Sequence, residues 1–283
     1  MAGKRVLGVA TALVLSAGLA ACSDGDDTKK AQPKDGADKA SESQVVRAAH
    51  RKTAAADTAK MTLTTKAATT GESVTVRGAG VMDLEDGDSR MTLTAQGQEI
   101  EQRVLDGIVY QKPPAAQRKQ LELPRNKTWM KIDPARLSGS NGQVSDPAES
   151  FAYTKGVNDR DVTKVGTETI DGARTTHYRV KVDVEALAEG DAARAEQLRE
   201  QLGTSTLPLD MWLDEQGRLR QETIRLTLRP KAEDGQKSQK VTSTTTLKFS
   251  DFGTEADVEA PAAADTVDVT KKLADASKAQ GTA

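Results

Sequence analysis

Hydrophobic and polar residues alternate one by one over most of the chain from Met61 onward. Met61 and Leu63 share one face of the first run, and in residues 91–96 apolar residues alternate with threonine and glutamine. A period of two is typical of a β-strand with one buried face. Asp-Gly pairs at 106–107 and 171–172 are strong hairpin-turn signals. The pattern predicts about eight to ten antiparallel strands in a sheet that is covered on one side only.

Three other segments predict helices. Residues 43–60 carry apolar residues at helical spacing behind a serine cap at position 41 or 43. Residues 184–202 predict a second helix, charged on one side, which Gly203 ends. A third, short helix is predicted at 267–276. The sequence therefore favours an α+β fold.

Two segments between the strands predict loops. Residues 113–124 begin and end with proline, which interrupts strands, and we expect a loop there. Residues 137–158 are rich in glycine, serine, asparagine and proline, with a short helix expected near 148–153.

The N-terminus has the pattern of an export signal that ends in a cysteine. Lys4 and Arg5 precede an apolar stretch, residues 6–19, which is too short to span a bilayer as a mature helix. Leu19-Ala20-Ala21-Cys22 resembles the bacterial lipobox, in which the cysteine receives diacylglycerol and the signal is cleaved before it. Two acyl chains anchor a protein firmly. An ordinary signal peptide with a chance cysteine and a start-anchor helix are the alternatives.

This interpretation divides the chain into three parts. We predict residues 1–21 as a lipoprotein signal peptide and residues 22–42 as the lipidated Cys22 with a disordered tether. Residues 43–283 form a single domain. The mature protein is then exported and held at the outer face of the cell membrane. Cys22 is the only cysteine, so we expect noncovalent packing to hold the domain together.

Charge and aromatic content narrow the range of partners. The chain has 40 Lys and Arg against 42 Asp and Glu, and loss of Lys4 and Arg5 with the signal leaves a net charge near −4 (38 against 42). This balance gives no electrostatic reason to expect nucleic acid. Aromatic residues make up 3% of the chain, which is few for stacking on bases or sugars, so the core must be built from aliphatic residues and methionine.

The sequence contains no motif that indicates catalysis or metal binding. His50 and His177 are the only histidines, on different predicted elements, and no cysteine is available to complete a zinc site. The nucleophile motif Gly-x-Ser-x-Gly and the phosphate-binding motif Gly-x4-Gly-Lys-Ser/Thr are absent. We therefore expect no enzyme activity, no metal and no cofactor. His177 falls on the charged face of its strand, and we expect it to be solvated.

The two tryptophans allow two interpretations. Strict alternation makes Trp212 point away from Leu209 and Met211. Together with Trp129 it could form a platform for a sugar. We favour the other interpretation, in which the tryptophans cover the outer face or the rim of the sheet.

The apolar positions of the predicted strands are candidates to line a ligand cavity. Methionines recur among them, and flexible thioethers suit adaptable pockets. An ordinary packed core is the alternative. The candidates are Met61, Leu63, Val74, Val76, Met82, Leu84, Met91, Leu93, Met130, Ile132, Leu209, Met211, Leu213, Ile224, Leu226 and Phe249.

Four segments in order carry a resemblance to a known family. "NKTWMKID" begins at Asn126, "VGTETIDGARTTHYRVKVDV" at Val165, "LPLDMWLDEQGRLR" at Leu207 and "FSDFGTEADVEAP" at Phe249. Behind the lipobox, this set resembles the LppX/LprG-type actinobacterial lipoproteins from about Ser43 to Pro261. The resemblance implies a LolA-like fold, a curved antiparallel half-barrel whose concave face is covered by helices. It also implies an apolar cavity for acyl chains of lipids or glycolipids, and no catalytic residues.

Two functions follow from these observations. The first is a monomeric, membrane-tethered lipoprotein that binds or carries a lipid or glycolipid, with residues 137–158 opening to admit the chains. The second is a non-enzymatic envelope interaction or sensor lipoprotein with a filled core and an envelope protein as its partner.

Overall fold

The structure is a computed structural model that describes residues 40–69, 71–137, 157–188, 192–228 and 240–281. Cys22, the predicted signal peptide and nearly all of the predicted tether lie outside these residues. The predicted short helix at 148–153 lies outside them as well.

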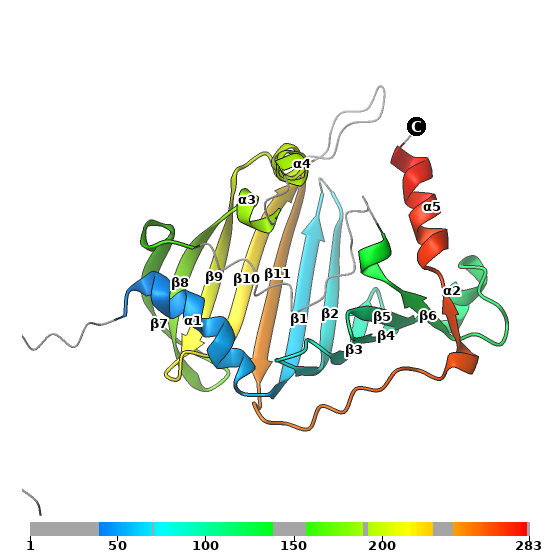
Figure 1. The fold of residues 1–283 in the computed structure, drawn as a ribbon, viewed down its shortest axis with the longest axis horizontal. Helices are drawn as coiled ribbons and strands as arrows, with labels where there is room; N and C mark the ends of the chain where they lie inside the picture. The colour runs from blue at the N-terminus through cyan, green and yellow to red at the C-terminus, as the bar shows by residue number, and fades with distance from the viewer. Residues whose placement is uncertain (1–39, 70, 138–156, 189–191, 229–239, 282–283) are drawn as a thin grey trace, which may run out of the picture. The chain divides into compact units, whose positions relative to one another are not determined.

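The described residues form one sheet of twelve strands (Figure 1). Their order is β12-β6-β5-β4-β3-β2-β1-β11-β10-β9-β8-β7, and every neighbouring pair is antiparallel except β12 with β6. The strands are β1 Thr58–Ala68, β2 Ser73–Asp83, β3 Ser89–Ala95, β4 Gln98–Leu105, β5 Ile108–Lys112, β6 Trp129–Ile132, β7 Val162–Ile170, β8 Ala173–Asp183, β9 Thr206–Asp214, β10 Leu219–Leu228, β11 Val241–Ser250 and β12 Thr266–Asp268. The predicted antiparallel sheet is confirmed, with more strands than the pattern indicated.

The helices lie before, within and after this run of strands. They are α1 Glu42–Ala54, α2 Ala115–Gln120, α3 Val184–Leu187, α4 Ala192–Leu202 and α5 Thr270–Gly281, with 3-10 turns η1 Pro134–Arg136, η3 Asp159–Asp161 and η4 Ala263–Asp265. Ser41 is the N-cap of α1: its hydroxyl accepts a hydrogen bond from the Gln44 amide, and the Gln44 side chain accepts one from the Ser41 amide. This reciprocal pair is a capping box, so the predicted cap is confirmed at position 41.

Four predicted boundaries differ from the structure. The first helix ends at Ala54, because the chain turns through Asp57 (φ 60°) and β1 begins at Thr58. The predicted loop at 113–124 contains α2, and the second predicted helix is divided into α3 and α4. The third begins only at Thr270, because residues 266–268 pair with β6 as strand β12.

The predicted hairpin turns are present. Both residues of Asp106-Gly107 have positive φ, 52° and 71°, and those of Asp171-Gly172 have 47° and 81°. Positive φ at both central residues matches the right-handed twist of the flanking strands. Gln96-Gly97 forms a third such turn, with φ of 50° and 76°, and joins β3 to β4.

Gly80 in β2 allows the sheet to curve. A Cβ atom on Gly80 would lie 2.0 Å from the carbonyl oxygen of Arg90 and 2.6 Å from Cα of Met91, on the neighbouring strand β3. Gly80 points to the apolar face of the sheet, the face of Met61, so β3 folds toward that face. Figure 1 shows β3 to β6 turned away from the upright β1 and β2. The apolar face is therefore the concave one.

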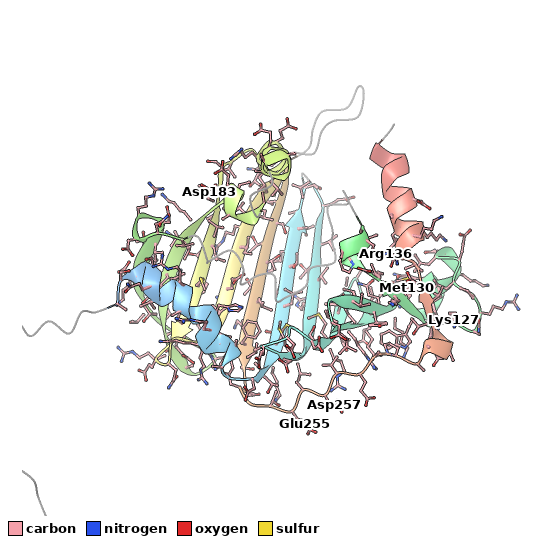
Figure 2. The ribbon with its side chains drawn as sticks, viewed as in Figure 1. Lys127, Met130, Arg136, Asp183, Glu255 and Asp257 are labelled. Carbon is pink, nitrogen blue, oxygen red and sulfur yellow. The ribbon has the colours of Figure 1, made fainter. Side chains whose placement is uncertain are left out.

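Helices cover this concave face at its two ends. Helix α1 crosses the strands β7 to β10 (Figure 1) and buries Val46 and Ala49 in the main core cluster, which includes Met61 and Phe249. At the other edge, Val269 at the start of α5 packs into a second cluster on β4, β5 and β6. Figure 2 shows Met130 and Lys127 at this edge, where the Lys127 ammonium donates to the carbonyl oxygens of residues 263 and 264.

Candidate functional site

The strand register places the predicted cavity residues on one face of the sheet. Met61 of β1 lies between Phe249 of β11 and Gly80 of β2, and Leu63 lies between Leu247 and Gly78 in the next row. Across the sheet, the pairing also places the candidates of β2, β3, β6, β9 and β10 on this face. Leu84 follows β2 in the same phase and is buried in the main cluster.

These residues divide into a packed part and an open part of the concave face. In the packed part the side chains are buried in the main cluster: Met61, Met82, Leu84, Met91, Leu209, Met211, Leu213 and Phe249. In the open part they are only partly buried, or exposed in the case of Val74: Leu63, Val74, Val76, Leu93, Ile224 and Leu226. Met130 and Ile132 belong to the separate second cluster.

The open part is continuous from strand to strand. Ile224 of β10 is followed across the sheet by Thr245, Thr65 and Val76. The hydroxyl groups of Thr65 and Thr245 lie 3.1 Å apart and form a hydrogen bond with each other, which lowers the cost of placing the two threonines in this otherwise apolar row. Gly78 in the adjacent row leaves the space above β2 to the side chains of Leu63 and Leu93.

One charged residue on the concave face was missed by the sequence analysis. Glu222 lies between Met211 of β9 and Leu247 of β11 and is 3% exposed. Its Oε2 atom is buried and has no hydrogen-bond partner. Burial raises the pKa of Glu222 to about 8. The signal was present in the sequence, because Glu222 is in phase with Ile224 and Leu226 on an otherwise apolar strand face.

The opposite, convex face contains a buried polar cluster around Asp210. Its carboxylate accepts hydrogen bonds from Nε2 of His177 (2.9 Å), from Nε of Arg179 (3.2 Å) and from Arg225. Burial alone would raise the pKa of Asp210, but these hydrogen bonds and the charge of Arg179 outweigh it and lower the pKa. The expectation of a solvated His177 is wrong: its ring is buried between strands and stacks on Trp212, with centroids 4.2 Å apart.

Both tryptophans lie on the convex face, as the favoured interpretation predicted. Trp129 is buried beneath Arg103, whose guanidinium carbon lies 4.8 Å from the ring centroid. Trp212 is covered by its stack with His177. Because other side chains already occupy these ring faces, the two tryptophans do not form a free platform for a sugar.

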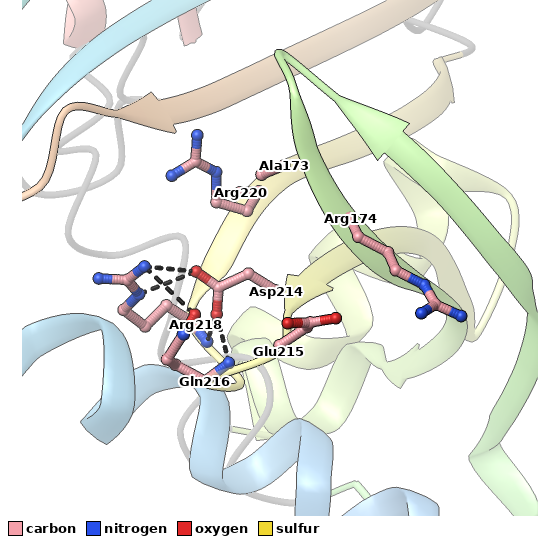
Figure 3. A pocket seen from close by; sticks show the side chains of 7 residues that line it. All are labelled: Ala173, Arg174, Asp214, Glu215, Gln216, Arg218 and Arg220. Atoms are coloured by element: carbon pink, nitrogen blue, oxygen red, sulfur yellow. Dashed lines mark hydrogen bonds and ion pairs between the residues drawn. The ribbon is translucent and has the colours of Figure 1, made fainter.

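A small pocket lies between the tips of the β7–β8 hairpin and the β9–β10 hairpin (Figure 3). It has a volume of about 190 Å³ and is walled by Ala173, Arg174, Asp214, Glu215, Gln216, Arg218 and Arg220. The Arg218 guanidinium donates to Asp214 at 2.8 Å, so its charge is already matched. Such a charged and small space does not suit an acyl chain.

The part of the chain that the structure describes contains neither a metal-binding cluster nor a membrane-spanning helix. No three His, Cys, Asp or Glu side chains there are grouped closely enough to hold a metal ion. None of the described helices is both long and apolar enough to cross a membrane.

The family of the chain follows from a comparison of its sequence with known families. The family model described as LppX_LprAFG lipoprotein matches residues 41–258, which is more than half of the chain. The chain therefore belongs to the LppX_LprAFG lipoprotein family, in agreement with the predicted resemblance.

Individual relatives are more distant. An uncharacterised 31.2 kDa protein of Streptomyces griseus is 35% identical over 162 residues, which cover 52% of this chain and 50% of that protein. The chain thus spans about half the length of this relative. The crystal structure of the Mycobacterium tuberculosis lipoprotein LppX is 18% identical, covering 76% of this chain and 98% of that one, with a TM-score of 0.43. That of LprF from Mycobacterium bovis is 14% identical, covering 78% and 97%, with a TM-score of 0.43.

Proposed function

We propose that this protein holds the acyl chains of a lipid or glycolipid against the open part of its concave face. The observation that carries the proposal is a continuous apolar surface that the rest of the described chain only partly covers. It is formed by Leu63 on β1, Val76 on β2 and Leu93 on β3, and it continues across Thr245 of β11 to Ile224 and Leu226 on β10. Apolar surface of this kind, next to a well-packed core, is typical of a binding site. Membership of a lipoprotein family supports the same proposal.

Binding of this kind needs no covalent chemistry. Each CH₂ group moved from water to an apolar site contributes about 0.8 kcal/mol. A lipid that leaves one bilayer for this face exchanges one apolar environment for another, so the net change is small and transfer can run in both directions. We therefore propose a carrier that works as a monomer, without a cofactor, and is not an enzyme.

We further propose that Cys22 carries the lipid anchor that holds the protein at the outer face of the cell membrane. In this arrangement residues 1–21 are the signal peptide, residues 22–42 the tether and residues 43–283 the binding domain. Nearly all of the predicted entry segment, residues 137–158, lies outside the described residues. Cys22→Ala removes the thiol that is alkylated, so the variant should leave the membrane fraction. Retention of the variant on membranes after a carbonate wash would indicate an uncleaved signal helix instead.

Solvent extraction of the purified domain tests the carrier function. Residues 43–283 are expressed without the anchor, purified, extracted with organic solvent and analysed by mass spectrometry. We expect a stoichiometric amount of co-purified acyl lipid. In the same domain, the test variant Leu93→Trp places an indole ring on the open part and should reduce the lipid content.

The packed part of the concave face favours a second candidate. Met61, Met211 and Phe249 are each at most 1% exposed, as in a core with no space for a ligand. If the extract is free of lipid and a specific envelope protein binds instead, the protein is an interaction or sensor lipoprotein and the carrier proposal is wrong.

A further inference from the structure

Glu222 of β10 lies on the concave face, between β9 and β11. Among the described residues of these three strands, its carboxyl group is the one ionisable group within the apolar rows of that face. Its neighbours in register are Met211 and Leu247, and the row continues to Leu63 on β1. The side chain is 3% exposed, and Oε2 has no hydrogen-bond partner. Glu222 lies at the border between the packed part, where Leu219 on the same strand is fully buried, and the open part, where Ile224 is partly exposed.

An unpaired buried carboxyl group is costly, and proteins rarely leave one without a reason. Among the other polar side chains of the same face, the hydroxyl of Ser89 is also buried without a partner, whereas two pairs satisfy each other. The Gln111 amide donates to Gln102 at 2.9 Å, and the hydroxyl groups of Thr65 and Thr245 are paired. Glu222 differs from Ser89 in lying at the border of the open part, where a ligand on that surface can supply the missing partner.

The surroundings of Glu222 keep it protonated at neutral pH. Burial is the one cause that raises its pKa to about 8, so no neighbouring charge offsets it. The charged groups of β9 and β11 nearest in register, Asp210 and Lys248, point to the convex face. The ionisable groups with described side chains on the two helices that contact β10 are Glu42, Arg47, His50, Arg51 and Lys52 on α1 and Glu196, Arg199 and Glu200 on α4. A protonated carboxyl group presents an O–H donor to its surroundings.

We propose that Glu222 donates a hydrogen bond to the carbonyl oxygen of an acyl ester in a lipid bound on the open part of the concave face. This inference rests on the proposed lipid-binding function and adds a specificity element to it. An ester carbonyl accepts hydrogen bonds and donates none, so it complements the acid O–H. The apolar residues in the rows around Glu222 then contact the chain that begins at the ester.

The test compares two lipids that differ in this acceptor alone. Vesicles of diester phosphatidylglycerol and of its diether analogue with the same chains are incubated with the lipid-free domain, and bound lipid is quantified by mass spectrometry. Wild type should prefer the diester by about 3- to 10-fold at pH 6, the value of one neutral hydrogen bond. At pH 10, where Glu222 is ionised and donates no hydrogen bond, the preference should disappear.

Variants at the same position separate the hydrogen bond from packing. Glu222→Gln keeps a donor that does not titrate, so it should prefer the diester at both pH values. Glu222→Leu has no donor and should bind both lipids equally, with the diether bound at least as well as by wild type. Glu99→Gln, on the exposed convex side of β4, is the matched control and should behave as wild type.

Two results would count against the inference in different ways. If Glu222→Leu keeps the diester preference of wild type, the inference is wrong although the protein binds lipid. If wild type binds neither lipid, the proposed function itself is wrong and the inference falls with it. The unfolding midpoint of each variant is measured in parallel, and a midpoint of Glu222→Leu no lower than that of wild type shows that the variant is folded.

Discussion

Two carboxyl groups on neighbouring strands are equally buried and have opposite properties. Asp210 on β9 and Glu222 on β10 are each 3% exposed. Asp210 points to the convex face, accepts hydrogen bonds from His177, Arg179 and Arg225, and has a lowered pKa. Glu222 points to the concave face, where Oε2 has no partner, and its pKa is raised to about 8.

The difference shows that the supply of donors, and not the depth of burial, decides whether a carboxyl group on this sheet is charged. The convex face provides three donors within one cluster and holds an anion. The concave face provides methionine and leucine and disfavours the charge. A surface that excludes charge and is only partly covered is suited to acyl chains, whereas the convex cluster serves the stability of the sheet.

The largest effect is expected from removal of the convex carboxylate. Asp210→Ala should lower the free energy of unfolding by about 2–4 kcal/mol at pH 7, because buried His177 loses a charged acceptor. Arg179 and Arg225 contribute less, because their side chains are 57% and 55% exposed and water replaces the aspartate. Denaturant unfolding measures the change.

The matched variant on the concave face is Glu222→Leu, which should leave stability unchanged or raise it, since it replaces an unpaired polar group by an apolar one. If Asp210→Ala and Glu222→Leu lower the free energy of unfolding equally, the two faces do not differ in how they treat a buried carboxyl group.

The pH dependence of stability should have opposite sign for the two groups. Folding raises the pKa of Glu222 from its ordinary 4.5 to about 8, so the folded state retains a proton that the unfolded state releases. Stability should therefore fall as pH rises from about 4.5 to 8, by on the order of 5 kcal/mol, and level off above. The lowered pKa of Asp210 acts at acid pH, where its contribution is lost as pH falls through the folded value.

Thermal unfolding of wild type and Glu222→Gln between pH 5 and 9.5 checks this expectation. The variant does not titrate at this position, so its profile should be flatter and its advantage should grow with pH. A parallel pair of profiles would show that Glu222 is ionised in the folded protein.

The sequence allowed the face of each apolar residue to be predicted because a period of two is a local property. Met61, Met91, Met211 and Phe249 lie on the predicted face, and both predicted Asp-Gly turns have positive φ at each residue. These features depend on neighbours in the chain and on backbone geometry alone.

What escaped prediction depends on contacts between distant segments. Strand β12 has three residues and exists because it pairs with Trp129, Met130 and Lys131 of β6, far away in sequence. The burial of His177 depends on Trp212 and Asp210 of the next strand. The division of the concave face into packed and open parts depends on where α1 lies, which no local pattern encodes.

A smaller effect is expected from overfilling the packed part. Met211→Trp adds volume at a side chain that is 1% exposed within the main cluster. Its neighbours must move, and the free energy of unfolding should fall by about 1–3 kcal/mol. Denaturant unfolding gives the value. A variant as stable as wild type would mean that the packed part has unfilled space beside Met211.

Substitution in the open part should cause the smallest change in stability and the largest change in the amount of bound lipid. Leu93 of β3 is partly exposed, and its Cδ2 lies over Gly78, so an indole ring at this position has room on the concave side. Leu93→Trp should change the free energy of unfolding by less than about 1 kcal/mol and remove most of the bound lipid, because the ring covers the surface on which chains would lie.

Thr94→Trp, the next residue on β3, places the same ring on the exposed convex face and should leave the lipid content unchanged. Mass spectrometry of extracts from the two variants decides the matter: equal lipid in both would show that the open part does not contact the ligand, and strong destabilisation by Leu93→Trp would show that the open part is packed core like the rest.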